Sequence, residues 1–170
     1  MSEPSATGWD HTFDLVIVGS GAGAMTAGVV AHDRGAKALL VEKSNRYGGS
    51  SAMSGGSLWV PCNHLMAEAG IEDDPEDAMA YLREITAGLV PEEKLQKFVD
   101  EASNALQYIS DHANVNAQVM NESGDVIPGL YAVGNCSSPV MGRTYAGAGA
   151  TLGPATTFAY VAARHAIPES

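Results

Sequence analysis

Glycines occupy two places in this sequence where backbone amides could hold a bound phosphate. The first group, Gly19, Gly21 and Gly23, directly follows the apolar run 15–18. Such a run predicts a buried parallel strand, and the strand must turn sharply into a helix over about 22–33. The first glycine permits the turn, the second lets the backbone approach a pyrophosphate, and the N–H groups that begin the helix bind its charge. Ala24, where a third glycine is common, still allows close packing of helix on strand.

An acidic residue follows at the interval that dinucleotide-binding folds use. A second apolar run, 38–41, ends in Glu42. A carboxylate at the end of this strand accepts hydrogen bonds from the ribose hydroxyls of an adenosine and repels the extra phosphate of NADP. Together the glycines and the acid predict a dinucleotide site. The alternative is a tight glycine turn that binds nothing.

A second glycine-rich signal lies toward the C-terminus. A predicted buried strand over 130–134 ends at Gly134 and Asn135, and the glycine-rich segment 147–154 leads into a helix that is predicted from Thr151 to about His165. Two such turns in one chain predict that both hold the same flavin dinucleotide. Segment 43–57 offers glycines, serine hydroxyls and free amides, which suit a loop along a pyrophosphate and ribityl chain. Its composition is also that of a flexible linker, which is the alternative.

The intervening sequence predicts the scaffold. Asn63 caps a short helix that stops at Gly70, Asp74 and Pro75 begin a second helix, and Pro91 opens a third. A β-hairpin over 117–127 follows, with a turn at Pro128-Gly129. The fold class that these elements predict is α/β: a Rossmann-like domain with a parallel central sheet, flanking helices and a β-hairpin or small antiparallel sheet.

Composition narrows the possible partners. The chain has 170 residues, a net charge of −11, and 9 Lys and Arg against 20 Asp and Glu. This balance disfavours nucleic acid and anionic membranes. Cys62 and Cys136 have no metal-binding spacing, and the five histidines are scattered, so no metal site is predicted. The sequence has no apolar run long enough to span a membrane and no signal segment, and we expect a cytoplasmic protein.

Three blocks of sequence, 48–61, 127–135 and 145–154, resemble the FAD-dependent 3-ketosteroid dehydrogenases. The resemblance is greatest to the Δ1-dehydrogenases, within the wider group of fumarate-reductase-like flavoproteins. It implies FAD as the cofactor, with the isoalloxazine near the N-terminus of the last helix, whose dipole would favour the anionic reduced ring. The residues assigned to FAD are Gly19, Ser20, Gly21, Ala22, Gly23, Ala24, Glu42, Lys43, Ser44, Gly49, Ser50, Ser51, Ala52, Gly55, Gly56, Gly134, Asn135, Ala150, Thr151 and Leu152.

The resemblance also implies a ketone-binding pair and a missing part. In the family, a tyrosine hydroxyl and a glycine N–H hold the steroid 3-keto oxygen, and Tyr145 and Gly149 match them. The family's base tyrosine and substrate domain have no counterpart here, because only a few residues separate the helix after Pro91 from the hairpin. We therefore expect residues 1–170 to be a single minimal FAD-binding domain, with a junction at 109–117 where the substrate domain of a longer flavoprotein is absent.

Three hypotheses about function follow. The preferred one is an FAD-binding module without full steroid dehydrogenation activity. The second is an active 3-oxosteroid dehydrogenase that transfers hydride from steroid C1 to FAD, and the third is a structural domain that no longer binds FAD. We also expect self-association into homo-oligomers through apolar surface near Met53, Trp59 and Tyr145.

Overall fold

The computed structural model describes residues 10–54, 58–111, 118–120, 126–131, 134, 140–142 and 147–168, with only the backbone described for 118–120 and 126–131. A strand–helix–strand unit comes first, and a run of helices, a pair of strands and a final helix follow. They are β1 (Leu15–Val18), α1 (Ala22–Asp33), β2 (Ala38–Val41), the 3₁₀ helix η1 (Gly49–Met53), α2 (His64–Glu68), α3 (Pro75–Thr86), α4 (Glu92–Asp111), β3 (Gln118–Met120), β4 (Val126–Tyr131) and α5 (Leu152–Ala166).

A β1-α1-β2 unit begins the fold, as the sequence predicts. The two strands pair in parallel, with Leu15 opposite Ala38 and Val18 opposite Val41. The side chain of Ile17 is buried and lies 3.7 Å from the position that a Cβ on Gly28 would take, so α1 covers this face of the sheet. The described residues thus form an α/β arrangement with a small parallel sheet of two strands.

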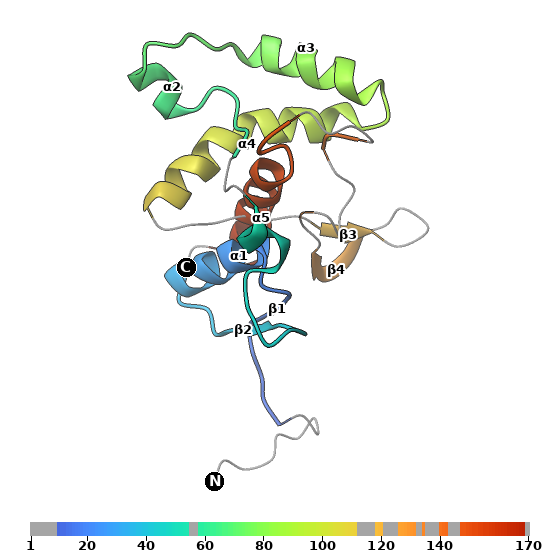
Figure 1. Cartoon of the computed structure of the whole chain (residues 1–170). Helices are drawn as coiled ribbons and strands as arrows, with labels where there is room; N and C mark the ends of the chain where they lie inside the picture. The colour runs from blue at the N-terminus through green and yellow to red at the C-terminus, as the bar shows by residue number, and fades with distance from the viewer. Residues whose placement is uncertain are drawn as a thin grey trace.

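The helices pack around α5. Figure 1 shows α5 between α1 and α4, and both neighbours are in contact with it. The core is apolar and centres on α3, α4 and α5, where Met79, Leu82, Leu95, Phe98 and Ala159 are fully buried. Of the described helices, none has the length and apolarity to cross a membrane. The core therefore fixes the axis of α5, and with it the position of the turn that precedes the helix.

Aromatic side chains connect this core to the segment after η1. The Trp59 ring stacks on Phe98, with ring centroids 5.8 Å apart, and Phe98 stacks in turn on Phe158 of α5 at 6.3 Å. The Trp59 ring is also tilted against the ring of Tyr81 of α3, with ring centroids 5.7 Å apart. Trp59 is therefore half-buried packing rather than open apolar surface, whereas Met53 is 89% exposed.

Local capping signals predict the helix starts correctly. The Asn63 side chain accepts hydrogen bonds from the amides of Leu65 and Met66, and the Asp74 carboxylate accepts one from Glu76 at 2.7 Å. These side chains satisfy amides that have no acceptor within the helix.

The hairpin is present, but its second strand differs from the prediction. β3 and β4 pair antiparallel, and β4 continues from Val126 through Pro128 and Gly129 to Tyr131. The sequence had suggested a turn at Pro128-Gly129. Proline is tolerated within an edge strand because it needs no partner for an N–H, and either strand of a two-stranded sheet is an edge.

Candidate functional site

The two glycine-rich turns, far apart in the sequence, line one cleft. The cleft has a volume of about 420 Å³, and its walls come from the β1-α1 turn, from η1 and from the start of α5. Its lining residues are Val18, Gly19, Gly21, Ala22, Gly23, Ala24, Ser50, Ser51, Ser54, Gly134, Thr151, Leu152 and Ala155. The convergence expected from sequence is therefore a feature of the structure.

The first wall is the turn from β1 into α1. Gly19 has φ of +94°, which favours glycine, and its amide donates to the Val41 carbonyl at 2.7 Å. No side chain caps α1 at Gly21; instead the Ala22 amide donates to Ser51 Oγ at 3.0 Å. A Cβ on Gly21 would lie 3.4 Å from that same oxygen. The loop containing η1 therefore lies directly against the first turn of α1.

The second wall is the turn before α5, and it is held by close backbone contact. Gly149 has φ of +85°, and a Cβ there would lie less than 3.0 Å from backbone atoms of Leu58 and Trp59. A Cβ on Gly153 would come equally close to the Trp59 carbonyl oxygen. The Trp59 amide donates to the Gly149 carbonyl at 3.2 Å. Both glycines are required where the chain after η1 passes the start of α5.

Both helices direct their N-termini at the cleft. Residues of the first turn of α1 and of α5 line it, and neither helix has an acidic residue in its first turn. The positive end of the helix dipole favours an anion at each terminus. The Ala22 amide of α1 and the Gly153 amide of α5 already donate within the protein, to Ser51 Oγ and to the Gly149 carbonyl. Ser50, Ser51 and Ser54 add hydroxyls between the two termini. The cleft is thus suited to a phosphate-containing ligand.

Glu42 lies behind the first wall, at the end of β2. The Ser20 hydroxyl donates to Glu42 Oε2, and the Ser44 amide donates to Oε1 at 2.9 Å. These hydrogen bonds, chiefly that from Ser20, lower the pKa of the Glu42 carboxyl below its ordinary value of 4.5. Glu42 is therefore a carboxylate at neutral pH, held in a fixed orientation.

The structure brings ten of the predicted cofactor residues to the cleft and leaves others beside it. The residues that do not line it are Ser20, Glu42, Lys43, Ser44, Gly49, Ala52 and Ala150. Gly55, Gly56, Asn135 and Tyr145 lie outside the described residues. Sequence reasoning missed Val18, Ser54 and Ala155, although each is next to, or one helical turn from, a predicted residue. Position relative to the glycines was the signal that could have found them.

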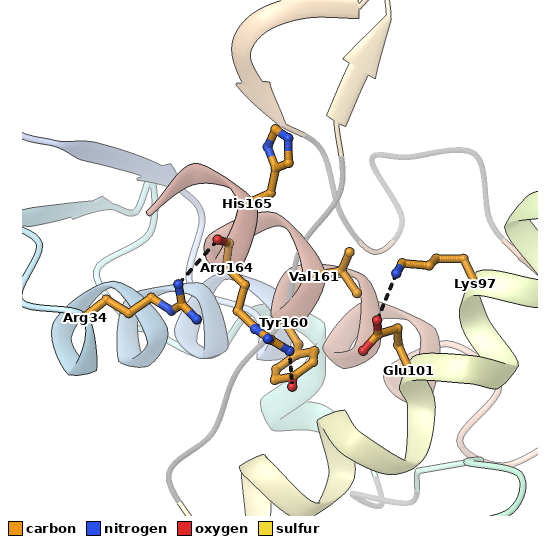
Figure 2. Close-up of a pocket in the computed structure, with 7 residues that line it drawn as sticks. All are labelled: Arg34, Lys97, Glu101, Tyr160, Val161, Arg164 and His165. Atoms are coloured by element: carbon orange, nitrogen blue, oxygen red, sulfur yellow. Dashed lines mark hydrogen bonds and ion pairs between the residues drawn. The ribbon is translucent and has the colours of Figure 1, made fainter. Parts of the chain in front are cut away.

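A second hollow carries several cations but is less suited to an anion. Figure 2 shows this hollow of about 380 Å³, lined by Arg34, Lys97, Glu101, Tyr160, Val161, Arg164 and His165. Lys97 pairs with Glu101 at 2.8 Å, and Arg164 donates to the Tyr160 hydroxyl at 2.5 Å. The Arg34 guanidinium donates to carbonyls at the end of α5. Since helix C-termini carry negative partial charge, these arginines complement the helices.

Comparison with known families identifies the family of this chain. A sequence model described as FAD binding domain matches residues 14–113 and 112–152, which include both glycine turns. The chain belongs to the FAD-binding domain family. FAD is the cofactor that this membership and the relatives indicate.

Curated relatives of this FAD-binding chain are oxidoreductases. It is 40% identical over 100 residues to 3-oxosteroid 1-dehydrogenase of Comamonas testosteroni, a match that covers 59% of this chain and 18% of the relative. It is 35% identical over 133 residues to 4-oxocyclohexanecarboxylate 2-dehydrogenase of Sinomonas cyclohexanicum, covering 76% and 23%. The chain thus spans only about a fifth of the length of these relatives.

Solved structures give the same family and fold. The 3-ketosteroid Δ1-dehydrogenase of Sterolibacterium denitrificans, in complex with 1,4-androstadiene-3,17-dione, is 45% identical with a TM-score of 0.55, covering 58% of this chain and 17% of that one. A flavocytochrome c3 fumarate reductase has a TM-score of 0.58 over 95% of this chain and 26% of its own, at 19% identity. The second likeness concerns the fold alone.

The residues of the cleft fit FAD. A pyrophosphate needs backbone N–H groups without intervening side chains, and Gly19, Gly21 and Gly23 leave that approach open beside the first turn of α1. An adenosine ribose needs an acceptor, and the carboxylate of Glu42 has lone pairs beyond those used by Ser20 and Ser44. FAD would supply the redox chemistry, and the protein would bind and orient it.

Proposed function

We propose that this chain is an FAD-binding module that holds FAD across the cleft and that by itself lacks full steroid dehydrogenation activity. The observation that carries the proposal is that the two glycine turns and the serines of η1 line the same cleft. A ligand that touches all three walls is extended, and the helix N-termini favour a phosphate beside them. FAD has both properties.

Each wall of the cleft would then contact a different part of FAD. The phosphate on the adenosine side would meet the turn Gly19–Ala24, and the adenosine ribose would lie toward Glu42. The pyrophosphate and ribityl chain would pass Ser50 and Ser51 toward Gly134, and the isoalloxazine would meet the start of α5 near Thr151 and Leu152. The amide dipoles at that helix start would favour negative charge on the pyrimidine edge of the ring.

The proposed substrate class is a cyclic ketone of the 3-ketosteroid type. The names of the relatives support this class, since they act on oxosteroids and on oxocyclohexane carboxylates. Tyr145 and the Gly149 amide would hold the ketone oxygen, as an oxyanion hole holds a developing negative charge. Proton removal requires a base, and the sequence between α4 and β3 offers no tyrosine for that role. This absence is the reason to propose a module with incomplete catalytic machinery.

An absorbance experiment tests the proposal. The purified chain, after incubation with excess FAD and gel filtration, is expected to keep the flavin absorbance band. Loss of all flavin would contradict FAD binding and favour a structural domain. Anaerobic addition of a 3-ketosteroid to the yellow protein is expected to leave the band unchanged. Bleaching of the band would show instead that the chain is an active dehydrogenase.

A further inference from the structure

Ser20 is a buried polar residue in the first glycine turn whose hydroxyl is used entirely within the protein. Its side chain is 1% exposed, whereas Gly19 and Gly21 on either side line the cleft and Ser20 does not. Its Oγ donates to Glu42 Oε2 and accepts the Gly48 amide at 2.9 Å. A buried hydroxyl with both functions satisfied has structural partners. Neither partner lines the cleft, but both lie next in sequence to, or are bonded to, segments that do.

The two partners belong to different segments. Glu42 ends β2, and Gly48 ends the loop that leads into η1. The Gly48 carbonyl in turn accepts from the Ala52 amide at 3.1 Å. Ser51 lies between these two residues in the sequence, and its Oγ accepts from the first amide of α1. One hydroxyl therefore connects the strand ends of the β1-α1-β2 unit to the loop that forms the middle wall of the cleft.

We propose that Ser20 is a positioning residue for FAD: it fixes the Glu42 carboxylate and the loop 43–48 in the arrangement that receives the adenosine ribose, without touching the cofactor itself. This inference rests on the proposed FAD site and assigns Ser20 a different role from its glycine neighbours. Glu42 also accepts from backbone amides, that of Ser44 on its other oxygen and, with smaller effect on its pKa, those of Lys43 and Ser20, so the Ser20 hydroxyl is the side-chain donor that fixes Oε2. Without the Ser20 hydroxyl the carboxylate can rotate, and the Gly48 amide loses its acceptor.

The test compares S20A with S110A, a matched serine-to-alanine change on the exposed face of α4, where the hydroxyl donates only to the Leu106 carbonyl. In S20A, the dissociation constant for FAD, measured by fluorescence titration, is expected to be about tenfold higher, as for loss of a hydrogen bond to a charged group. S110A is expected to bind like the unchanged protein. In the cofactor-free S20A protein, carbon-detected NMR titration is expected to show a higher pKa for the Glu42 carboxyl.

A double-mutant comparison separates positioning from simple structural loss. E42Q removes the charge that Ser20 orients, so adding S20A to E42Q is expected to weaken FAD binding by clearly less than tenfold. An equal loss in both backgrounds would overturn the proposal, as would an unchanged Glu42 pKa or unchanged FAD affinity in S20A. Failure of the unchanged protein to bind FAD would contradict the proposed function instead. The Glu42 titration, made without FAD, still reports on the Ser20–Glu42 connection in that case.

Discussion

Gly153 and Gly28 both lie inside helices, yet the structure predicts opposite effects for replacing them by alanine. A Cβ on Gly153 would lie less than 3.0 Å from the Trp59 carbonyl oxygen, whereas one on Gly28 would make an ordinary contact of 3.7 Å with Ile17. G153A is therefore expected to lower the free energy of unfolding by about 2 kcal/mol through overpacking. G28A is expected to raise it by roughly 0.5–1 kcal/mol, because alanine favours helix.

Urea denaturation followed by tryptophan fluorescence measures both variants under the same conditions. The pair controls for helix propensity, which acts in the same direction at both sites. A G153A variant as stable as G28A would contradict the close contact between the segment after η1 and the start of α5.

Glu42 makes a prediction about pH. Its pKa is lower in the folded protein than in the unfolded chain, so its stabilising interactions are complete above the ordinary glutamate pKa and are lost as the pH falls through the lowered value. FAD affinity is expected to stay constant from pH 7 to about pH 5 and to fall below that range. E42Q is expected to bind FAD about tenfold more weakly at pH 7 and to lose this dependence.

Titrations of FAD at several pH values, with circular dichroism to verify that the protein stays folded, measure this profile. An affinity that falls between pH 7 and pH 5 would require a different titrating group. Unchanged affinity in E42Q would remove Glu42 from the site.

At the scale of elements, α1 and α5 lie close to each other at both of their ends. Their N-termini line the cleft, and beyond the end of α1 the Arg34 guanidinium donates to the carbonyls of Arg164 and Ile167 at the end of α5. These carbonyls have no acceptor role within the helix, and a cation there also meets the negative end of the dipole. Arg34 thus helps to fix the position of α1 relative to α5, and with it the relative position of two walls of the cleft.

Replacing Arg34 tests this connection. R34M keeps much of the aliphatic stem and removes the donors, and it is expected to cost about 1 kcal/mol in the free energy of unfolding. The loss should appear in hydrogen exchange as faster exchange of amides in the last turn of α5, with the start of α4 unchanged as an internal control. Equal protection of the α5 amides in both proteins would contradict a stabilising role for Arg34.

Elements with local signals were predictable from the sequence. Asn63 and Asp74 cap helices through their own side chains, and the apolar runs at 15–18 and 38–41 predict the paired parallel strands β1 and β2. The predicted burial of these strands is wrong in part: Ile17 is buried, whereas Val16 and Val18 are exposed and no residue of β2 is fully buried. The course of β4 through Pro128 was not predictable in this way, because a proline–glycine pair signals a turn locally and only pairing with β3 extends the strand. The Ser20 hydroxyl bond to Glu42 also depends on which segments meet.

At the scale of the whole molecule, the fold unites turns from opposite ends of the chain. The glycine pattern alone predicted that both turns contact a dinucleotide, and the packing of α5 between α1 and α4 brings them to one cleft. Sequence could not specify the close backbone contacts of Gly149 and Gly153 with Leu58 and Trp59, since these depend on the tertiary path of the chain. Self-association through apolar surface stays a prediction. Of the positions named for it, Met53 is exposed, Trp59 is half-buried and Tyr145 lies outside the described residues.

The most direct measurement of the central claim is an NMR titration of the isotope-labelled chain with FAD. The amides of Gly21 and Gly23 on one wall, and of Thr151 and Leu152 on the other, are expected to shift together and to follow one saturation curve with a single dissociation constant. Shifts confined to one wall, or two curves with different dissociation constants, would contradict a single FAD held by both glycine turns.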